Sequence, residues 1–180
     1  MHASLPAGVM AINSLDLDNA VIIALGSNLP GDFKSSEALL DAAVERFPAI
    51  GLSVVKRSSW WRSAAWPDPN APQYRNGVAI VETIRTPREV LAGLLDLESE
   101  FGRCRGERHA PRTLDLDLIA YGREVRDQTS FQLPHPRAHE RRFVMGPLAQ
   151  IAPDWRHPAS GKSARELLAA ANVGIDATVD

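Results

Sequence analysis

Two aspartates separated by one residue carry the clearest chemical signal in the chain. Asp115 and Asp117 alternate with Leu114, Leu116 and Leu118. Successive side chains of a β-strand point to opposite faces, so both carboxylates lie on one face, with Cα atoms about 6.6 Å apart, and the leucines face a core. Carboxylates this close repel each other, and Mg2+ is held by one or two carboxylates together with substrate phosphates. The pattern predicts a magnesium site; its alternative is an exposed sheet face where arginines pair with both carboxylates.

Basic side chains gather around this pair. The chain has 17 Arg and only 3 Lys, and nine of the Arg lie between residues 103 and 142. A guanidinium group presents a planar fork that pairs with two phosphate oxygens. Arg103, Arg105, Arg112, His135 and Arg141 flank the aspartates in the sequence. Carboxylates for a metal ion beside arginines for phosphate predict a nucleoside triphosphate site, and scattered surface ion pairs are the alternative.

Four further residues have the chemistry to bind a flat heterocycle. Trp66, Tyr74 and Phe143 lie in or beside expected loops, where aromatic rings can sandwich a planar ring. Asn76 offers both a donor and an acceptor to the edge of a heterocycle. Ordinary packing is the alternative for each of them.

The composition excludes several classes of protein. The chain has 180 residues, 44% of them hydrophobic and 23% charged, which is typical of a globular domain and not of a disordered chain. The single cysteine, Cys104, excludes a disulfide framework and a cysteine zinc site. A net charge of −2 and the lack of a long apolar run give no reason to expect nucleic acid or a membrane as partner.

The first 18 residues lack the basic start and apolar stretch of a signal peptide. We therefore expect a leader over residues 1–18, one domain over residues 19–180, and a cytoplasmic protein. No exposed apolar stripe is evident, so we also expect a monomer.

The elements that must position these residues follow from hydrophobic periodicity and capping signals. We expect strands at residues 21–25, 52–62, 74–83, 114–118 and 131–133. We expect helices that begin near Ser36, after Thr86 and at Ser163. Polar loops at 66–72 and 102–111 separate them. The order is that of an α+β, ferredoxin-like α/β sandwich: an antiparallel sheet with helices on one face and two long mobile loops that carry function.

Taken together, four segments resemble the 6-hydroxymethyl-7,8-dihydropterin pyrophosphokinases of folate biosynthesis. They are residues 24–29, residues 59–76, residues 102–117, which end in Pro-Arg-Thr-Leu-Asp-Leu-Asp, and residues 133–143. The resemblance implies transfer of pyrophosphate from ATP, the co-substrate, to the hydroxymethyl group of the pterin, with release of AMP. It also implies two Mg2+ ions on Asp115 and Asp117, with Arg103 and Arg112 as further catalytic residues.

The resemblance also assigns binding residues for the two substrates. For ATP they are Glu98, Arg103, Arg105, Arg112, Leu118, Ser130, Gln132, His135 and Arg141. For the pterin they are Gly26, Ser63, Ala64, Trp66, Tyr74, Asn76 and Phe143. No general base is evident, and His135 is assigned to phosphate binding.

The chain departs from the family pattern near the loops. Ser63-Ala64-Ala65 stands where Thr-Pro-Pro is common, His109 stands where tryptophan is frequent, and Ser130 replaces an arginine that can occur there. The arginine loop is one residue shorter. These changes bear on loop closure and affinity, not on the metal residues.

Two other functions use similar residues. Nucleotidyl transferases and cyclases also place paired aspartates and two metal ions on a ferredoxin-like sheet, but they release pyrophosphate. A non-catalytic, small-molecule-binding regulatory domain has the same shape but no use for the aspartates and arginines.

Overall fold

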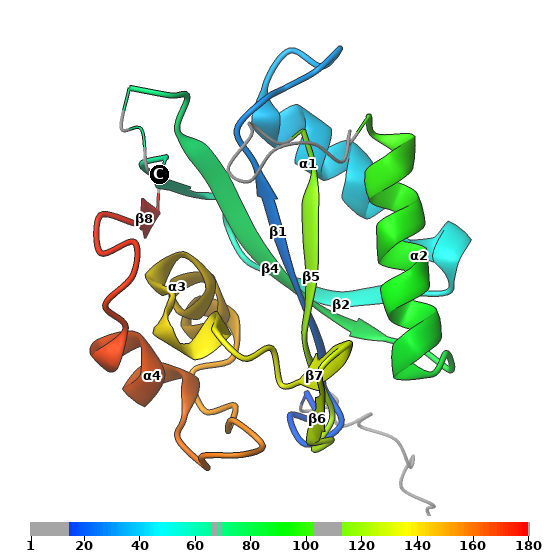
Figure 1. Ribbon diagram of the computed structural model, residues 1–180, viewed down its shortest axis with the longest axis vertical. Coiled ribbons are helices and arrows are strands. Elements are labelled where there is room, and N and C mark those ends of the chain that lie inside the picture. Colours follow the sequence, from blue (N-terminus) through cyan, green and yellow to red (C-terminus); the bar gives the residue numbers. More distant parts are fainter. Residues whose placement is uncertain (1–14, 66–67, 69, 103–112, 180) are drawn as a thin grey trace, which may run out of the picture.

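An antiparallel sheet forms the centre of the molecule (Figure 1). The computed structural model describes residues 15–65, 68, 70–102 and 113–179. The main-sheet strands are β1 (Val21–Ser27), β2 (Ser53–Arg57), β3 (Trp61–Ser63), β4 (Tyr74–Glu82), β5 (Asp115–Tyr121) and β8 (Thr178–Val179). Their order is β5-β1-β4-β3-β8, and β2 also pairs with β4. A separate hairpin joins β6 (Arg126–Gln128) to β7 (Phe131–Leu133). The predicted α+β class and antiparallel sheet are confirmed.

The single strand expected over residues 52–62 is two strands in the structure. Both β2 and β3 pair with β4, and the chain breaks its pairing between them, where the Ser58 hydroxyl accepts a hydrogen bond from the Val78 N–H at 3.0 Å. Trp60 packs against one core of the molecule and Trp61 lies buried on the opposite face of the sheet. Adjacent strand residues point to opposite faces, which explains this division.

Two capped helices cover the first face of the sheet. They are α1 (Ser36–Glu45) and α2 (Pro87–Glu100). The N-cap of α1 is Ser35, one residue before the expected Ser36, and its hydroxyl accepts from the Ala38 N–H at 3.1 Å. Thr86 and Glu89 close the predicted capping box of α2. Such caps satisfy N–H groups that the first helical turn leaves without partners.

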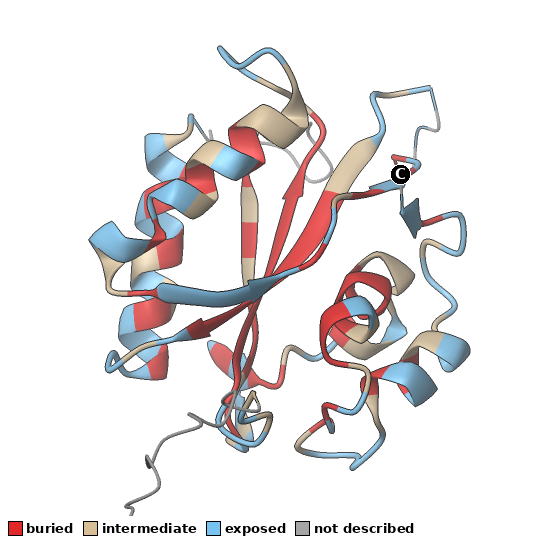
Figure 2. Cartoon of the chain, turned by 180° about the vertical axis from the view of Figure 1, so that it is seen from behind, coloured by how far each residue is buried: buried red, intermediate tan, exposed pale blue. Residues whose placement is uncertain are grey.

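The second face is also covered by helices, so the expectation of helices on one face only is corrected. α3 (Arg142–Ile151) and α4 (Ala164–Ala170) lie on that face (Figure 1). Alternate residues of β1 fill two different cores: Ile23 packs with α1 and α2, and Ile22 packs with α3 and α4. Figure 2 shows β1 buried along its whole length, as a strand with helices on both sides must be.

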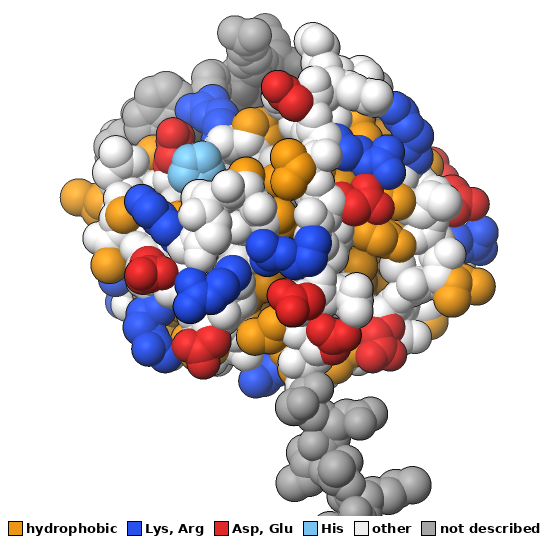
Figure 3. Space-filling view, turned by 90° about the horizontal axis from the view of Figure 1, so that it is seen from below, with side chains coloured by type: hydrophobic (Ala, Val, Ile, Leu, Met, Phe, Trp, Pro, Cys, Tyr) orange, Lys and Arg blue, Asp and Glu red, His pale blue; other side chains and the backbone are white. Residues whose placement is uncertain are grey.

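Two short 3-10 helices, Phe47–Ile50 and Ala138–Glu140, complete the fold. Within the described ranges no helix combines the length and apolarity needed to cross a membrane. On the face seen from below, basic and acidic side chains lie interspersed (Figure 3).

Candidate active site

The two aspartates lie on β5 at the edge of the sheet. Leu116 and Leu118 are buried in the core under α1 and α2, while Asp115 and Asp117 are half-buried on the opposite face. This is the alternation that the sequence predicts. The carboxylates therefore belong to the face covered by α3, and Asp117 pairs across the sheet with Ala24 of that face.

A buried glutamate holds the backbone between the two aspartates. The Leu116 N–H donates to Glu98 Oε1 at 2.7 Å, and only 2% of Glu98 is exposed. Glu98 projects from the last turn of α2, so the helix reaches the strand through this carboxylate. The bond fixes the peptide from which both aspartates extend. The residue that Glu98 contacts, Leu116, lies between Asp115 and Asp117 on β5.

A histidine and an arginine complete the polar group around Asp117. The Arg141 Nη1 atom lies 4.0 Å from Asp117 Oδ2, and Arg141 is the N-cap residue of α3. Burial lowers the pKa of His135 from its ordinary value, and the charge of Arg141 acts in the same direction, while Asp117 opposes the shift. His135 Nδ1 accepts from the Arg137 N–H at 3.2 Å, which leaves the ring proton on Nε2. His135 is therefore a neutral hydrogen-bond donor near neutral pH.

The residues predicted for a pterin extend the same face away from the aspartates. Pairing places Asp115, Gly26 and Asn76 side by side on β5, β1 and β4. The Asn76 side-chain nitrogen donates to the Ser63 hydroxyl at 2.9 Å, and Ser63 pairs with Tyr74. A Cβ atom on Gly26 would lie 3.5 Å from Asn76 Oδ1. The glycine thus leaves a recess in the floor between Asn76 and Asp115.

Ala64 and Phe143, two further residues predicted for the pterin, lie on different elements. Ala64 follows β3, and its N–H donates to Asp176 Oδ2 at 2.5 Å. Phe143 stands in the first turn of α3, with the Arg141 guanidinium 5.8 Å from its ring centre. No local sequence pattern indicates a role for Asp176, because its partner lies 112 residues away.

The remaining predicted residues lie elsewhere or outside the described ranges. Leu118 is buried in the first core, Ser130 is exposed in the β6–β7 turn, and Gln132 on β7 donates to Asp127 Oδ1 at 2.8 Å. Four predicted site residues, and a position where the chain departs from the family, lie outside the described residues: Trp66, Arg103, Arg105, Arg112 and His109.

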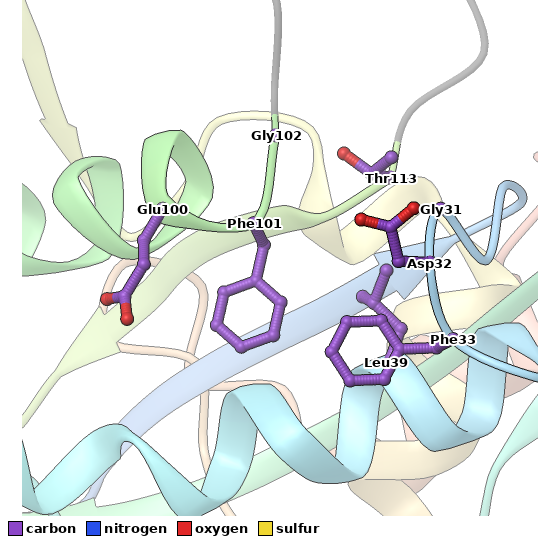
Figure 4. Close-up of a pocket in the computed structure, with 8 residues that line it drawn as sticks. All are labelled: Gly31, Asp32, Phe33, Leu39, Glu100, Phe101, Gly102 and Thr113. Atoms are coloured by element: carbon purple, nitrogen blue, oxygen red, sulfur yellow. The ribbon is translucent and has the colours of Figure 1, made fainter.

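A separate pocket of about 510 Å3 lies between the start of α1 and the end of α2 (Figure 4). Phe33 and Phe101 stack there, with ring centres 5.8 Å apart, and Asp32 and Glu100 contribute carboxylates. Its lining contains none of the residues predicted for ATP or the pterin. The pocket therefore does not define the candidate site.

The chain is similar to enzymes of one known family. The family model described as 7,8-dihydro-6-hydroxymethylpterin-pyrophosphokinase (HPPK) matches residues 22–153. A 2-amino-4-hydroxy-6-hydroxymethyldihydropteridine pyrophosphokinase from Synechocystis sp. is 41% identical over 150 residues, covering 83% of this chain and 75% of the relative. The enzyme of the same name from Pseudomonas aeruginosa is also 41% identical over 150 residues, covering 83% of this chain and 90% of the relative.

Larger proteins contain a similar segment. The folic acid synthesis protein fol1 of Pneumocystis carinii is 38% identical over 84% of this chain, which spans only 20% of that protein. The crystal structure of wild-type Plasmodium falciparum HPPK-DHPS superposes with a TM-score of 0.62 at 10% identity, over 84% of this chain and 44% of that one. At this identity the superposition supports the fold.

Proposed function

The chain belongs to the 7,8-dihydro-6-hydroxymethylpterin-pyrophosphokinase family, a family of folate-biosynthesis enzymes, and we propose that it transfers pyrophosphate from ATP to 6-hydroxymethyl-7,8-dihydropterin. In this reaction the hydroxymethyl oxygen bonds to the β-phosphorus of ATP, the bond from that phosphorus to the oxygen shared with the α-phosphate breaks, and AMP leaves. The hydroxyl proton passes to water. We also propose that residues 19–180 form one domain and that the protein acts as a monomer.

The observation that carries the proposal is the shared face of the sheet. Asp115, Asp117, Gly26 and Asn76 line one surface across three adjacent strands, and the start of α3 lies over it. The polar half of this surface has the groups that a triphosphate requires, and the other half has the amide and aromatic groups that a flat ring requires. An enzyme that joins these two substrates needs both halves next to each other.

The donor set fits two Mg2+ ions. Asp115 and Asp117 are both half-exposed, so their oxygens are accessible, and oxygen ligands are those that Mg2+ prefers. Within the described ranges no group of three or more His, Cys, Asp or Glu residues gathers as a protein-only metal cage. Two carboxylates that leave the other positions to water and phosphate oxygens match the usual habit of this ion. When bound, Mg2+ neutralises charge on the phosphates and acidifies a coordinated hydroxyl.

The surrounding residues hold the triphosphate. His135 donates from Nε2 and Arg141 contributes a fixed positive charge, and both groups meet at Asp117. Arg103, Arg105 and Arg112 supply further guanidinium groups in the proposal, and Arg103 and Arg112 act on the transferred group. Glu98 acts here through the backbone of β5, while Leu118, Ser130 and Gln132 are assigned to the adenosine. Positioning and charge neutralisation supply most of the catalysis in such transfers.

We place the pterin against the sheet surface formed by Gly26 and Asn76. Tyr74 and Phe143, with Trp66, flank its ring faces, and the backbone at Ser63 and Ala64 meets its edge. The Ser63 hydroxyl already accepts from the Asn76 amide nitrogen, so the amide oxygen is directed toward the recess above Gly26. An oriented amide recognises the polar edge of a heterocycle without losing side-chain entropy on binding.

A product assay tests this proposal. The protein is mixed with ATP, Mg2+ and the hydroxymethyl-dihydropterin, and AMP, ADP and pyrophosphate are separated. Asp117→Asn is the test variant, and Asp154→Asn is its control, because Asp154 is exposed and its ion pair with Arg165 lies on the surface. We expect AMP that depends on the pterin in the wild type and the control, and a loss of at least a hundredfold in Asp117→Asn.

Other products would contradict the proposal. Pyrophosphate in place of AMP would indicate nucleotidyl transfer, and ADP would indicate transfer of a single phosphoryl group. Full activity in Asp117→Asn would refute the proposal that Asp117 binds a catalytic Mg2+ ion. No product at all from the wild type would favour a non-catalytic binding domain.

A further inference from the structure

The C-terminal segment runs alongside the edge of the candidate pterin site. β8 extends the sheet beside β3, with Trp61 paired to Val179 and Arg62 paired to Thr178. The register places Asp176 opposite Ala64, two residues beyond the last backbone pair. There the Asp176 carboxylate accepts the Ala64 N–H at 2.5 Å and takes the place of a backbone partner.

The same segment is tied to the start of α3. The Arg142 N–H donates to the Val173 carbonyl at 2.8 Å, and the Arg142 guanidinium donates to the Ala177 carbonyl at 3.1 Å. Gly174 adopts a φ of +67°, which side chains other than glycine rarely accept. A Cβ atom on Gly174 would lie 2.5 Å from the Phe143 ring, so the glycine backbone forms the surface against which the ring rests.

We propose that residues 172–179, the C-terminal strap, set the spacing between the Phe143 ring and the Ala64 backbone, so that Gly174 and Asp176 are positioning residues for the pterin. The inference rests on the proposed function. Ala64 follows β3 and Phe143 lies in α3, and the strap contacts both: Asp176 accepts the Ala64 N–H, and Gly174 lies against the Phe143 ring. A bound ring must place its face against Phe143 and its edge at the Ala64 backbone at the same time, and contacts with the ring weaken within a fraction of an ångström. The strap therefore determines how well the pterin fits and leaves the triphosphate half unchanged.

Two variants of the full chain test the strap. Asp176→Ala removes the carboxylate from the Ala64 N–H, and because the Asp176 side chain is exposed, the change leaves no cavity in the core. Gly174→Ala inserts a methyl group against the Phe143 ring. Gly161→Ala is the matched control, since Gly161 has a φ of +71° but open space where its Cβ would lie. For each protein the KM for the pterin and the KM for ATP are measured from AMP formation, with the melting temperature as a check of folding.

We expect the KM for the pterin to rise about fivefold in Asp176→Ala, which is the usual effect of one lost hydrogen bond, and at least as much in Gly174→Ala. The KM for ATP should stay within twofold in both, and neither KM should change in Gly161→Ala. The inference is overturned if the KM for the pterin in Asp176→Ala matches that of the control, or if both KM values rise together. If Gly174→Ala does not fold, Asp176→Ala decides the matter alone. A wild type that forms no AMP overturns the proposed function itself, and the strap inference with it.

Discussion

Glu98 offers a test of how the paired aspartates are held in place. Its carboxylate accepts the Leu116 N–H at 2.7 Å, in a position where 2% of Glu98 and 3% of Leu116 are exposed. Glu98→Ala removes this acceptor and leaves the N–H buried. Glu98→Gln keeps a carbonyl oxygen that can accept the same bond. The two variants therefore separate loss of the bond from loss of the charge.

The magnitude follows from the burial of the donor. A buried N–H without a partner costs about 1–3 kcal/mol in free energy of unfolding. With a urea dependence of about 2 kcal/mol per molar, that loss moves the unfolding midpoint down by roughly 0.5–1.5 M. Glu100→Ala is the control, because the Glu100 carboxylate pairs with Arg46 on the surface and such pairs contribute about 0–1 kcal/mol.

Two measurements check the expectation. Urea unfolding should place Glu98→Ala well below Glu100→Ala, with Glu98→Gln between Glu98→Ala and the wild type. Because the bond holds the peptide between Asp115 and Asp117, the Mg2+ concentration that gives half-maximal activity should rise in Glu98→Ala. A midpoint for Glu98→Ala equal to that of Glu100→Ala would refute the structural role that we assign to Glu98.

Three further predictions concern the rest of the fold. Burial, followed by nearby cationic groups, lowers the pKa of His157 from its ordinary value of 6.5, so its contribution to stability is complete above pH 6.5 and falls as the pH drops toward its folded value. The melting temperature of His157→Asn should then decline less than that of the wild type between pH 7.5 and 5, and an equal decline would contradict this. Gly146→Ala places a methyl group inside the Trp61 ring and should lower the free energy of unfolding by about 1–3 kcal/mol, measured in urea; an unchanged midpoint would show that α3 can move away. Lys56 donates to the last carbonyl of α3 at 2.8 Å, so Lys56→Met should cost about 0.5–1.5 kcal/mol in the same assay, and no loss would mean that water replaces the amine without penalty.

The placement of the two aspartates could be predicted because its signal is local. Strand alternation alone places Asp115 and Asp117 on one face and the leucines on the other, and burial in the structure follows that pattern. The two capping boxes are local in the same sense, and both are present at Thr86 and Ser163. Interactions within three or four residues leave a pattern that a single sequence reveals.

The sequence patterns do not predict the helix over residues 142–151, and this omission changes the expected cover of the sheet. The resemblance assigns Arg141 and Phe143, at the start of this segment, to substrate binding, and Pro147 lies inside it, where proline usually opposes a helix. Pro147 is the sixth residue of the helix and lies beyond its first turn, so the helix lacks the hydrogen bond that an N–H at this position would donate to the Phe143 carbonyl. Because this helix is missing from the expected elements, the sequence predicts helices on only one face of the sheet. In the structure α3 covers the other face, on which Asp115 and Asp117 lie.

Contacts between distant segments were harder to predict than the placement of the aspartates. Asp176 meets Ala64 across 112 residues, and Gly174 meets Phe143 where the chain between α4 and β8 passes the start of α3. No spacing rule connects such residues, since their proximity depends on the whole topology. The departure of Ser63-Ala64-Ala65 from the family pattern acquires a physical reason here: a proline at position 64 has no N–H and could not donate to Asp176. The hydrogen bond between Ala64 and Asp176 therefore restricts the backbone at position 64, which a proline would restrict through its ring.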